Sequence, residues 1–308
     1  MVMSAEGLRT RCAREMSQSP RGFAGCSWLR QAFLDVPREA FVPDRVWWPA
    51  RTGDGRYPLI DRSVKPRAWL KAVYQPGAAL ITQIDDGAVL PTGPADGVFT
   101  SSISSPGVVI ELLRHLAPEP GERILEIGTG TGYTTALLSH RAGDAGVVTV
   151  EIDSRLAARA EDRLRAAGVN PRVIMGDGEE GHAGGGPYDR IVSTASVRRI
   201  PRAWLRQLKP GGVLVTPLDS PFGYDLLVRL IGDGHGAAAG AAVAQVEFMR
   251  VRGQRPRRPY ADLGWPSGLE ATQWRDLQVA AGQEDQRIAA VADGASPRRG
   301  WAGELVGW

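Results

Sequence analysis

Residues 123–133 read Arg-Ile-Leu-Glu-Ile-Gly-Thr-Gly-Thr-Gly-Tyr, and the rest of the chain is organised around them. Its apolar part, 124–127, is typical of a short buried strand, and the glycines that follow predict a tight turn. Residues 133–140, which include Ala-Leu-Leu, predict the start of a helix. A strand, a glycine-rich turn and a helix in this order bring the backbone close to a ligand and point the first N–H groups of the helix towards it.

The spacing of the glycines restricts the kind of ligand. A dinucleotide-binding turn has the pattern G-x-G-x-x-G, with the pyrophosphate at the helix N-terminus. Here Gly128, Gly130 and Gly132 form G-x-G-x-G, and an acid, Glu126, precedes them. A carboxylate is unfavourable beside a diphosphate and favourable beside a cation. S-adenosylmethionine carries an ammonium and a sulfonium and no phosphate, so the pattern favours this cofactor.

Two further acids stand at the ends of predicted strands. Residues 147–150 lead into Glu151, where a carboxylate is placed to bind ribose hydroxyls, and residues 172–175 lead to Asp177, which is placed to receive an adenine amino group. Each acid alone also fits an ordinary turn or surface position, but the three together predict a nucleoside–methionine site. The predicted cofactor-binding residues are Glu126, Gly128, Thr129, Gly130, Gly132, Glu151, Ile152, Asp177 and Gly178.

Composition excludes several other classes of protein. The 308 residues are 43% hydrophobic, enough for a sizeable core, and a net charge of +3 is too small to indicate nucleic-acid binding. Two cysteines without a CxxC motif and four scattered histidines predict neither a disulfide framework nor a metal site. No long apolar run suggests a membrane span or a signal peptide. We therefore expect a cytoplasmic protein without membrane, metal or nucleic-acid partners.

The chain divides into three predicted regions. Residues 1–98 combine two helices, the second over 27–34, with an insertion at 47–97 that is rich in Trp, Pro and Gly, has little helical periodicity and predicts a β-rich lid. Residues 99–252 form the predicted cofactor-binding domain. Residues 253–308 are a C-terminal extension with an amphipathic stretch at 268–291 and a basic, proline-containing start that reads as a solvated linker.

Strands and helices alternate within the central region, which predicts an α/β fold with a doubly wound, mostly parallel sheet and the ligand at the carboxyl ends of the strands. An antiparallel hairpin is predicted to close the sheet. The expected helices cover residues 133–141, 154–167 and 201–208, the later strands 190–194 and 212–217, and the hairpin strands 226–231 and 243–251.

The order of these motifs resembles the protein-L-isoaspartate O-methyltransferase family. Asp-Val-Pro-Arg-Glu-Ala-Phe-Val-Pro at 35–43 is similar to its N-terminal signature, Ser-Ile-Ser-Ser-Pro at 102–106 to its T-I-S-Q-P loop, and 125–133 to its L-E-I-G-T-G-S-G-Y. The resemblance implies a class I S-adenosylmethionine-dependent methyltransferase fold, a carboxyl methyl ester as product and S-adenosylhomocysteine as by-product. It also implies a peptide or protein substrate.

Carried over position by position, the resemblance implies a catalytic serine and a set of substrate-binding residues. Ser104 would hold the substrate carboxylate, although a serine there also fits a helix N-cap. Ser193 and Thr194 stand at the end of a predicted strand, where ordinary strand propensity would also account for them. The residues implied to bind substrate are Ser102, Ile103, Ser105, Ser193 and Thr194.

Departures from the family pattern concern the substrate side. The gap before the serine loop exceeds the family's short link, Gln is replaced by Ser105, and a C-terminal extension is added. These features are similar to a branch associated with ribosomally made, modified peptides, which implies methylation of an aspartate in a macrocyclic peptide and collapse of the ester to an aspartimide. The alternative is isoaspartyl methylation in protein repair, and a non-enzymatic cofactor-binding scaffold is a third reading.

Overall fold

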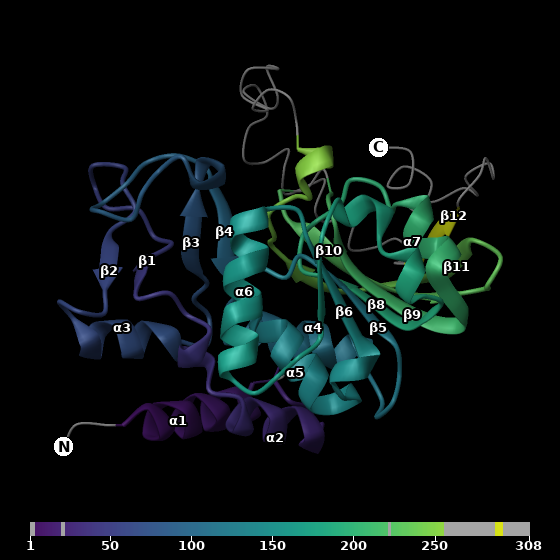
Figure 1. The fold of residues 1–308 in the computed structure, drawn as a ribbon, viewed down its shortest axis with the longest axis horizontal. Helices are drawn as coiled ribbons and strands as arrows, with labels where there is room; N and C mark the ends of the chain where they lie inside the picture. The colour runs from purple at the N-terminus through teal and green to yellow at the C-terminus, as the bar shows by residue number, and fades with distance from the viewer. Residues whose placement is uncertain (1–3, 20–21, 221–222, 256–286, 292–308) are drawn as a thin grey trace, which may run out of the picture. The chain divides into compact units, whose positions relative to one another are not determined.

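The computed structural model describes residues 4–19, 22–220, 223–255 and 287–291. The chain falls into two compact units, residues 1–176 and residues 177–308. Most of the C-terminal extension lies outside the described residues, including 268–286 of the predicted amphipathic stretch at 268–291, whose last five residues form a strand. The first unit contains the N-terminal helices, a small antiparallel sheet and the glycine-rich turn (Figure 1).

The first unit opens with two helices, as the sequence predicts. Helix α1 spans Ala5–Ser17 and its N-terminus is capped by Ser4, whose hydroxyl accepts a hydrogen bond from the Gly7 backbone N–H at 3.1 Å. Helix α2 spans Ser27–Asp35 and packs along α1 and along α5 (Figure 1).

A four-stranded antiparallel sheet follows, in the order β2-β1-β3-β4. We call it the insertion sheet. It consists of β1 (Arg45–Trp47), β2 (Leu59–Asp61), β3 (Leu80–Ile84) and β4 (Phe99–Ile103). It therefore extends beyond the predicted insertion at both ends, because its first strand starts before residue 47 and its last strand is the one that leads into Ser104.

The insertion also contains a helix, α3 (Pro66–Val73), where the sequence analysis found little helical periodicity. The helix is only two turns long, begins with a proline and buries Trp69, whose indole N–H donates to the Pro43 carbonyl at 3.0 Å. So short a helix carries few periodic positions, and tertiary packing rather than local pattern stabilises it.

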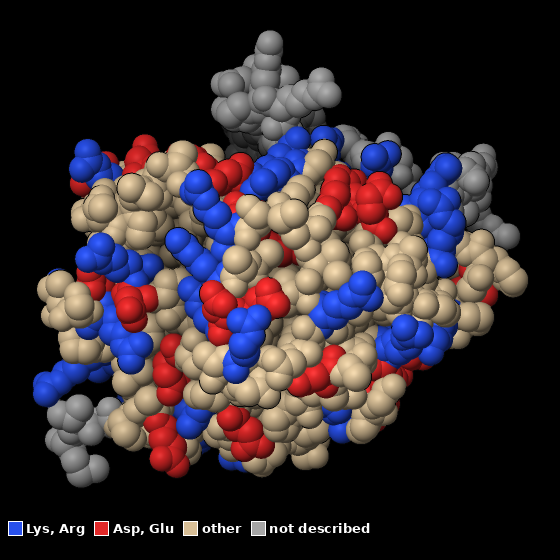
Figure 2. Space-filling model, in the orientation of Figure 1, with Lys and Arg blue, Asp and Glu red and all other residues tan. Residues whose placement is uncertain are grey.

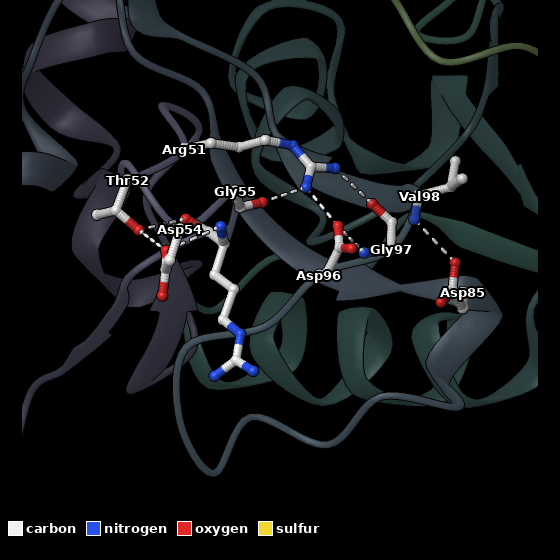
Figure 3. Close-up of polar contacts among 9 residues, drawn as sticks. Arg51, Thr52, Asp54, Gly55, Asp85, Asp96, Gly97 and Val98 are labelled. Carbon is white, nitrogen blue, oxygen red and sulfur yellow. Dashed lines mark hydrogen bonds and ion pairs between the residues drawn. The ribbon is translucent and has the colours of Figure 1, made fainter.

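The loops of the insertion are held by an arginine. Arg51 donates to the Gly55 carbonyl, to the Asp96 carboxylate and to the Gly97 carbonyl (Figure 3). Its guanidinium lies 4.2 Å from the centre of the Tyr57 ring. Beneath these loops is a small apolar core that contains Trp47, Tyr57, Ile81, Ile84 and Ala95. The loops between β1 and β2 and between β3 and β4 are thus joined to each other.

Three parallel strands carry the glycine-rich turn. They are β5 (Ile124–Ile127), β6 (Val147–Glu151) and β7 (Arg172–Met175), in the order β5-β6-β7. Helices α5 (Tyr133–Ala142) and α6 (Ser154–Ala166) connect them, and α4 (Pro106–Leu116) precedes them. Every residue of β5 and β6 is buried, as expected for strands covered by helices. The prediction for this region is confirmed to within a residue.

The second unit contains β8 (Tyr188–Ser193) and β9 (Leu208–Leu218), which are parallel and joined through α7 (Arg202–Gln207). Three antiparallel strands follow beside β9. They are β10 (Asp225–Gly232), which pairs with β9, β11 (Ala237–Val246), which pairs with β10, and β12 (Arg287–Val291), which pairs with β11. The predicted second hairpin strand, 243–251, is wrong in its bounds. Residues 238–242, rich in Ala and Gly, pair with β10, since tertiary pairing outweighs the low strand propensity of alanine.

Charged side chains of both signs are interspersed on the face that Figure 2 shows, in keeping with the small net charge of +3. Among the described residues, His, Cys, Asp and Glu form no group able to hold a metal ion. No helix in the described part of the chain combines the length and apolar character that a membrane span requires.

Candidate functional site

The glycine-rich turn adopts a conformation that only glycine tolerates easily. Gly128, Gly130 and Gly132 have φ values of 91°, 55° and 89°. Gly132 is also the N-cap of α5, and a Cβ atom added to it would lie 3.2 Å from Cγ of Leu164. The hydroxyls of Thr129 and Thr149 are 2.7 Å apart and join the turn to β6. These contacts define the shape of the turn.

Glu126 lies at the carboxyl end of β5 and is wholly buried. Its Oε2 accepts a hydrogen bond from the Thr135 hydroxyl, but its Oε1, also buried, has no hydrogen-bond partner in the described structure. Burial raises the pKa of Glu126 to about 7, and the nearby hydroxyls of Thr135 and Thr149 offset part of that shift. A buried carboxylate oxygen without a donor is costly, so the position fits a ligand that brings a cationic donor.

Glu151, at the end of β6, is held by the backbone on both oxygens. Oε2 accepts from the Gly130 N–H at 2.9 Å and Oε1 from the Asp153 N–H at 3.1 Å. The side chain is 7% exposed, and burial raises the pKa of the carboxyl group. The neighbouring Ile152 is 38% exposed, so it offers an apolar surface beside the acid. The structure thus brings together Glu151 and the glycine-rich turn, as predicted from the sequence.

Strand β4 leads directly into the serine loop. The Ser102 carbonyl lies close to the turn, because a Cβ atom added to Gly130 would be 3.8 Å from that oxygen. Ile103 is buried, and Ser105 caps α4 by accepting from the Val108 N–H at 3.4 Å. Since Ser105 supplies the cap, the hydroxyl of Ser104 is not committed to it.

A buried arginine that the sequence analysis did not select supports the serine loop. Arg38 donates from Nη2 to the Ser104 carbonyl at 2.7 Å and from Nε to the Val73 carbonyl at 2.9 Å. Its guanidinium lies 5.0 Å from the centre of the Tyr133 ring, and burial lowers its pKa. The sequence contains it within the Val-Pro-Arg-Glu signature, but nothing local indicates a partner 66 residues away.

The insertion sheet reaches the same region through Gln83, a second residue that the sequence analysis missed. Gln83 is 8% exposed and its Nε2 donates to Oδ2 of Asp153 at 3.0 Å. Asp153 caps α6 with its other carboxylate oxygen, which accepts from the N–H groups of Arg155 and Leu156.

In the second unit, Asp177 is exposed and its Oδ1 accepts from the Glu179 N–H at 2.9 Å. The Gly178 carbonyl accepts from the indole N–H of Trp204 at 2.7 Å. Buried Gln254 continues the network by donating to the Glu179 carboxylate at 2.7 Å. The loop that carries Asp177 is therefore fixed by contacts from α7 and from the segment after β11.

The Ser-Thr-Ala-Ser strand end is engaged largely within the second unit. The buried Ser193 hydroxyl donates to the Ala195 carbonyl at 2.6 Å, and the Ser196 hydroxyl donates to Asp225 at 2.8 Å. Burial raises the pKa of the Asp225 carboxyl group. Thr194 is half-buried. The hydroxyls of Ser193 and Ser196 thus shape the strand end, while Thr194 keeps partial exposure.

Comparison with known proteins adds the family. The family model for Protein-L-isoaspartate(D-aspartate) O-methyltransferase matches residues 91–255. Protein-L-isoaspartate O-methyltransferases from Ignicoccus hospitalis and Azorhizobium caulinodans are 40% and 42% identical over 132 and 134 residues. Those matches cover 42% and 43% of this chain and 63% and 61% of the relatives, so the chain spans less than two thirds of their length.

Solved structures show the same fold. A protein-L-isoaspartate O-methyltransferase superposes with a TM-score of 0.58 at 22% identity, covering 79% of this chain and 65% of that one. A putative Plasmodium falciparum enzyme of that name, in complex with S-adenosyl-L-homocysteine, gives 0.55 at 15% identity, with 80% and 97% covered. The predicted α/β fold of the class I methyltransferases is confirmed.

Proposed function

The chain belongs to the protein-L-isoaspartate(D-aspartate) O-methyltransferase family, and on that premise we propose that it is an S-adenosylmethionine-dependent carboxyl O-methyltransferase. Its proposed substrate is an isoaspartyl residue in a peptide or protein. The observation that carries the proposal is the pair of buried carboxylates at the glycine-rich turn, Glu126 and Glu151, one with an unpartnered oxygen and the other oriented by two backbone N–H groups.

The residues of the turn fit S-adenosylmethionine. The unpartnered Oε1 of Glu126 suits the ligand ammonium, and Glu151 suits the ribose hydroxyls. Ile152 supplies apolar surface for a purine. For Asp177 and Gly178, a role in binding the adenine stays a prediction from the sequence. When bound, S-adenosylmethionine supplies an electrophilic methyl group.

The chemistry needs no strong general base. A substrate carboxylate with a pKa near 4 is already ionised at neutral pH, so its oxygen can accept the methyl group directly. The chain's contribution is to align the carboxylate and to exclude water while opposite charges cancel. Ser104 is proposed to hydrogen-bond that carboxylate, with the Arg38 guanidinium fixing its backbone.

The main prediction from the sequence is methylation of an aspartate in a modified ribosomal peptide. The relatives support the alternative, methylation of an isoaspartyl residue, better than that prediction. All the curated relatives reported above are named for isoaspartate. Aspartimide formation from an ordinary aspartate remains a second candidate, favoured by the insertion sheet, which precedes Ser104 and supplies the strand leading into it.

One experiment separates the two candidates. The purified chain is incubated with S-adenosylmethionine and either an isoaspartyl peptide or a precursor peptide encoded beside its gene, with and without its macrocycle, and products are followed by mass spectrometry. The matched control is the same peptide with aspartate in place of isoaspartate. The proposal expects a gain of about 14 Da on the isoaspartyl peptide alone, the mass of a methyl group replacing a proton.

The other outcomes are equally definite. A gain on the modified precursor, followed by net loss of a water, would favour the second candidate. Absence of methyl transfer to any carboxylate, with S-adenosylhomocysteine still bound, would leave a cofactor-binding scaffold and contradict the proposal.

A further inference from the structure

We propose that Gln83 is a positioning residue for the cofactor-binding carboxylates and that, through it, cofactor binding is energetically coupled to the insertion sheet. This inference rests on the proposed function, because it assumes that S-adenosylmethionine binds at Glu151. Two groups of contacts carry it: a directed chain of hydrogen bonds from the β3–β4 loop to Asp153, and the approach of β4 to the glycine-rich turn.

The chain of hydrogen bonds has only one consistent direction. An ionised carboxylate accepts hydrogen bonds and cannot donate, so the amide NH₂ of Gln83 must face Asp153, as it does at 3.0 Å. Oε1 of Gln83 then faces Thr100, whose hydroxyl donates to it at 3.0 Å. The Thr100 oxygen in turn accepts the backbone N–H of Asp86 at 2.9 Å. Each group in the chain fixes the orientation of the next.

The chain begins at a strained corner. Asp85 and Asp86 have φ values of 48° and 50°, which lie in the left-handed region of backbone conformation that residues other than glycine seldom adopt. The corner is held by Asp85, whose backbone N–H donates to the Val98 carbonyl at 2.8 Å and whose Oδ1 accepts the Val98 N–H at 2.8 Å (Figure 3). Backbone strain of this kind persists where surrounding contacts over-determine it, and it concentrates at functional sites.

The chain ends beside the cofactor carboxylate. Asp153 receives Gln83 on one oxygen and caps α6 with the other, and its backbone N–H donates to Oε1 of Glu151 at 3.1 Å. The charge of Asp153 also raises the pKa of Glu151, after the larger effect of burial. Moving Gln83 would therefore move the group that orients Glu151.

The second contact is independent of the first. The Ser102 carbonyl, on β4, lies beside Gly130, whose N–H donates to the other oxygen of Glu151. The insertion sheet thus reaches one neighbour of Glu151, Asp153, by a hydrogen bond from Gln83 on β3, and it approaches the other, Gly130, through β4. A ligand that orders Glu151 will also stabilise this arrangement of the sheet, since coupling between two sites is reciprocal.

Gln83→Leu tests the proposal, because leucine keeps the size of the side chain and removes both hydrogen bonds. We expect S-adenosylhomocysteine to bind about tenfold more weakly to Q83L, a change within the usual range of coupling between two sites. The matched control is Thr82→Val, on the same strand, which removes the Thr82–Ser101 hydroxyl contact and leaves Gln83 intact. Measured by calorimetry, the Kd of T82V for S-adenosylhomocysteine should lie within twofold of the wild-type value.

A double-mutant cycle distinguishes positioning from general loosening. Asp153→Asn retains helix-capping ability and loses the charge that Gln83 addresses. If Gln83 acts through Asp153, the double variant binds no more weakly than the weaker single variant, whereas independent effects would multiply. Three results would each overturn the inference. They are effects of the two single substitutions on the Kd that multiply fully in the double variant, equal losses of affinity in Q83L and T82V, and an unchanged Kd in Q83L.

Hydrogen exchange on the wild-type chain keeps the test open if Q83L fails to fold. S-adenosylhomocysteine should slow amide exchange in β3 and β4 and leave β2 unchanged. If the rates of amide exchange in β3 and β4 are the same with and without the cofactor, the proposed coupling is wrong. Failure of the wild type to bind S-adenosylhomocysteine at all would instead defeat the proposed function, so the two failures are distinguishable.

Discussion

The glycine-rich region and the insertion sheet use the same kinds of polar contact over very different distances along the chain. Thr135 and Glu126 are 9 residues apart and Gly130 and Glu151 are 21 apart. In the insertion, Arg51 reaches Asp96 over 45 residues and Gln83 reaches Asp153 over 70. The first region therefore leaves a local signature in the sequence, whereas the second is defined only once the chain has folded.

The largest effect is expected where that local signature is broken. Gly132→Ala forces a side chain into a φ of 89° and places its Cβ 3.2 Å from Leu164. We expect the free energy of unfolding to fall by about 2 kcal/mol and cofactor affinity to drop at least about tenfold, since the turn must shift. Urea denaturation and calorimetry measure the two quantities.

Gly55→Ala is the matched control in the insertion. Its φ is 78°, but no atom lies within 4 Å of an added Cβ. Only the backbone strain remains, so a loss of about 1 kcal/mol with unchanged cofactor affinity is expected. Equal losses of cofactor affinity in G132A and G55A would contradict the distinction between the regions.

The next effect concerns the point at which the two regions meet. Ser104→Ala should lower kcat by about tenfold or more, because a substrate hydrogen bond would be lost, and should leave the melting temperature unchanged. Ser105→Ala removes the N-cap of α4 and should cost about 1 kcal/mol of stability.

Steady-state kinetics and thermal unfolding of both serine variants separate the roles. If S104A destabilises the protein while turnover is kept, Ser104 has a structural role and the substrate assignment fails.

A smaller, pH-dependent effect is expected at Glu126. Its pKa is about 7 in the folded protein and 4.5 for an ordinary glutamate, so the folded state keeps a proton that the unfolded chain loses. Stability contributed by this group is therefore present below pH 4.5 and declines as the pH rises through 7. Glu126→Gln should flatten that dependence.

Cofactor binding changes with pH in the opposite direction. An ammonium ligand needs the ionised carboxylate, so affinity should rise towards pH 8 and binding at pH 6 should release a proton, and both features should vanish in E126Q. Calorimetry at pH 6 in two buffers of different ionisation enthalpy counts that proton. Proton release that persists in E126Q would assign it to another group.

The cofactor side of the fold could be predicted because each of its signals is short. The Ile-Leu-Glu-Ile strand, the turn and the acid at Glu151 all fall within 124–151, and the structure joins them by backbone hydrogen bonds. Strand period and turn chemistry encode such an arrangement directly.

The remaining contacts had no local signal. Arg38 and Gln83 are ordinary polar residues in the sequence, and only tertiary folding buries them against Ser104 and Asp153. The first two strands of the insertion sheet, β1 and β2, are three residues long, too short for an alternating pattern, and β11 is made largely of alanine. In each case pairing between distant segments overrides local propensity.

The smallest effect is expected at Arg51, which lies in the insertion, as Gln83 does. Arg51→Ala removes the contacts to Gly55, Asp96 and Gly97, but the arginine is exposed, so solvent and salt screen its charge. The melting temperature should fall only slightly, and less so in high salt, with the Kd for S-adenosylhomocysteine unchanged. Arg51 holds the loops of the insertion together, whereas Gln83 connects β3 to the cap of α6. A loss of cofactor affinity in R51A as large as that in Q83L would mean that the whole insertion, and not the Gln83–Asp153 contact, orders the cofactor site.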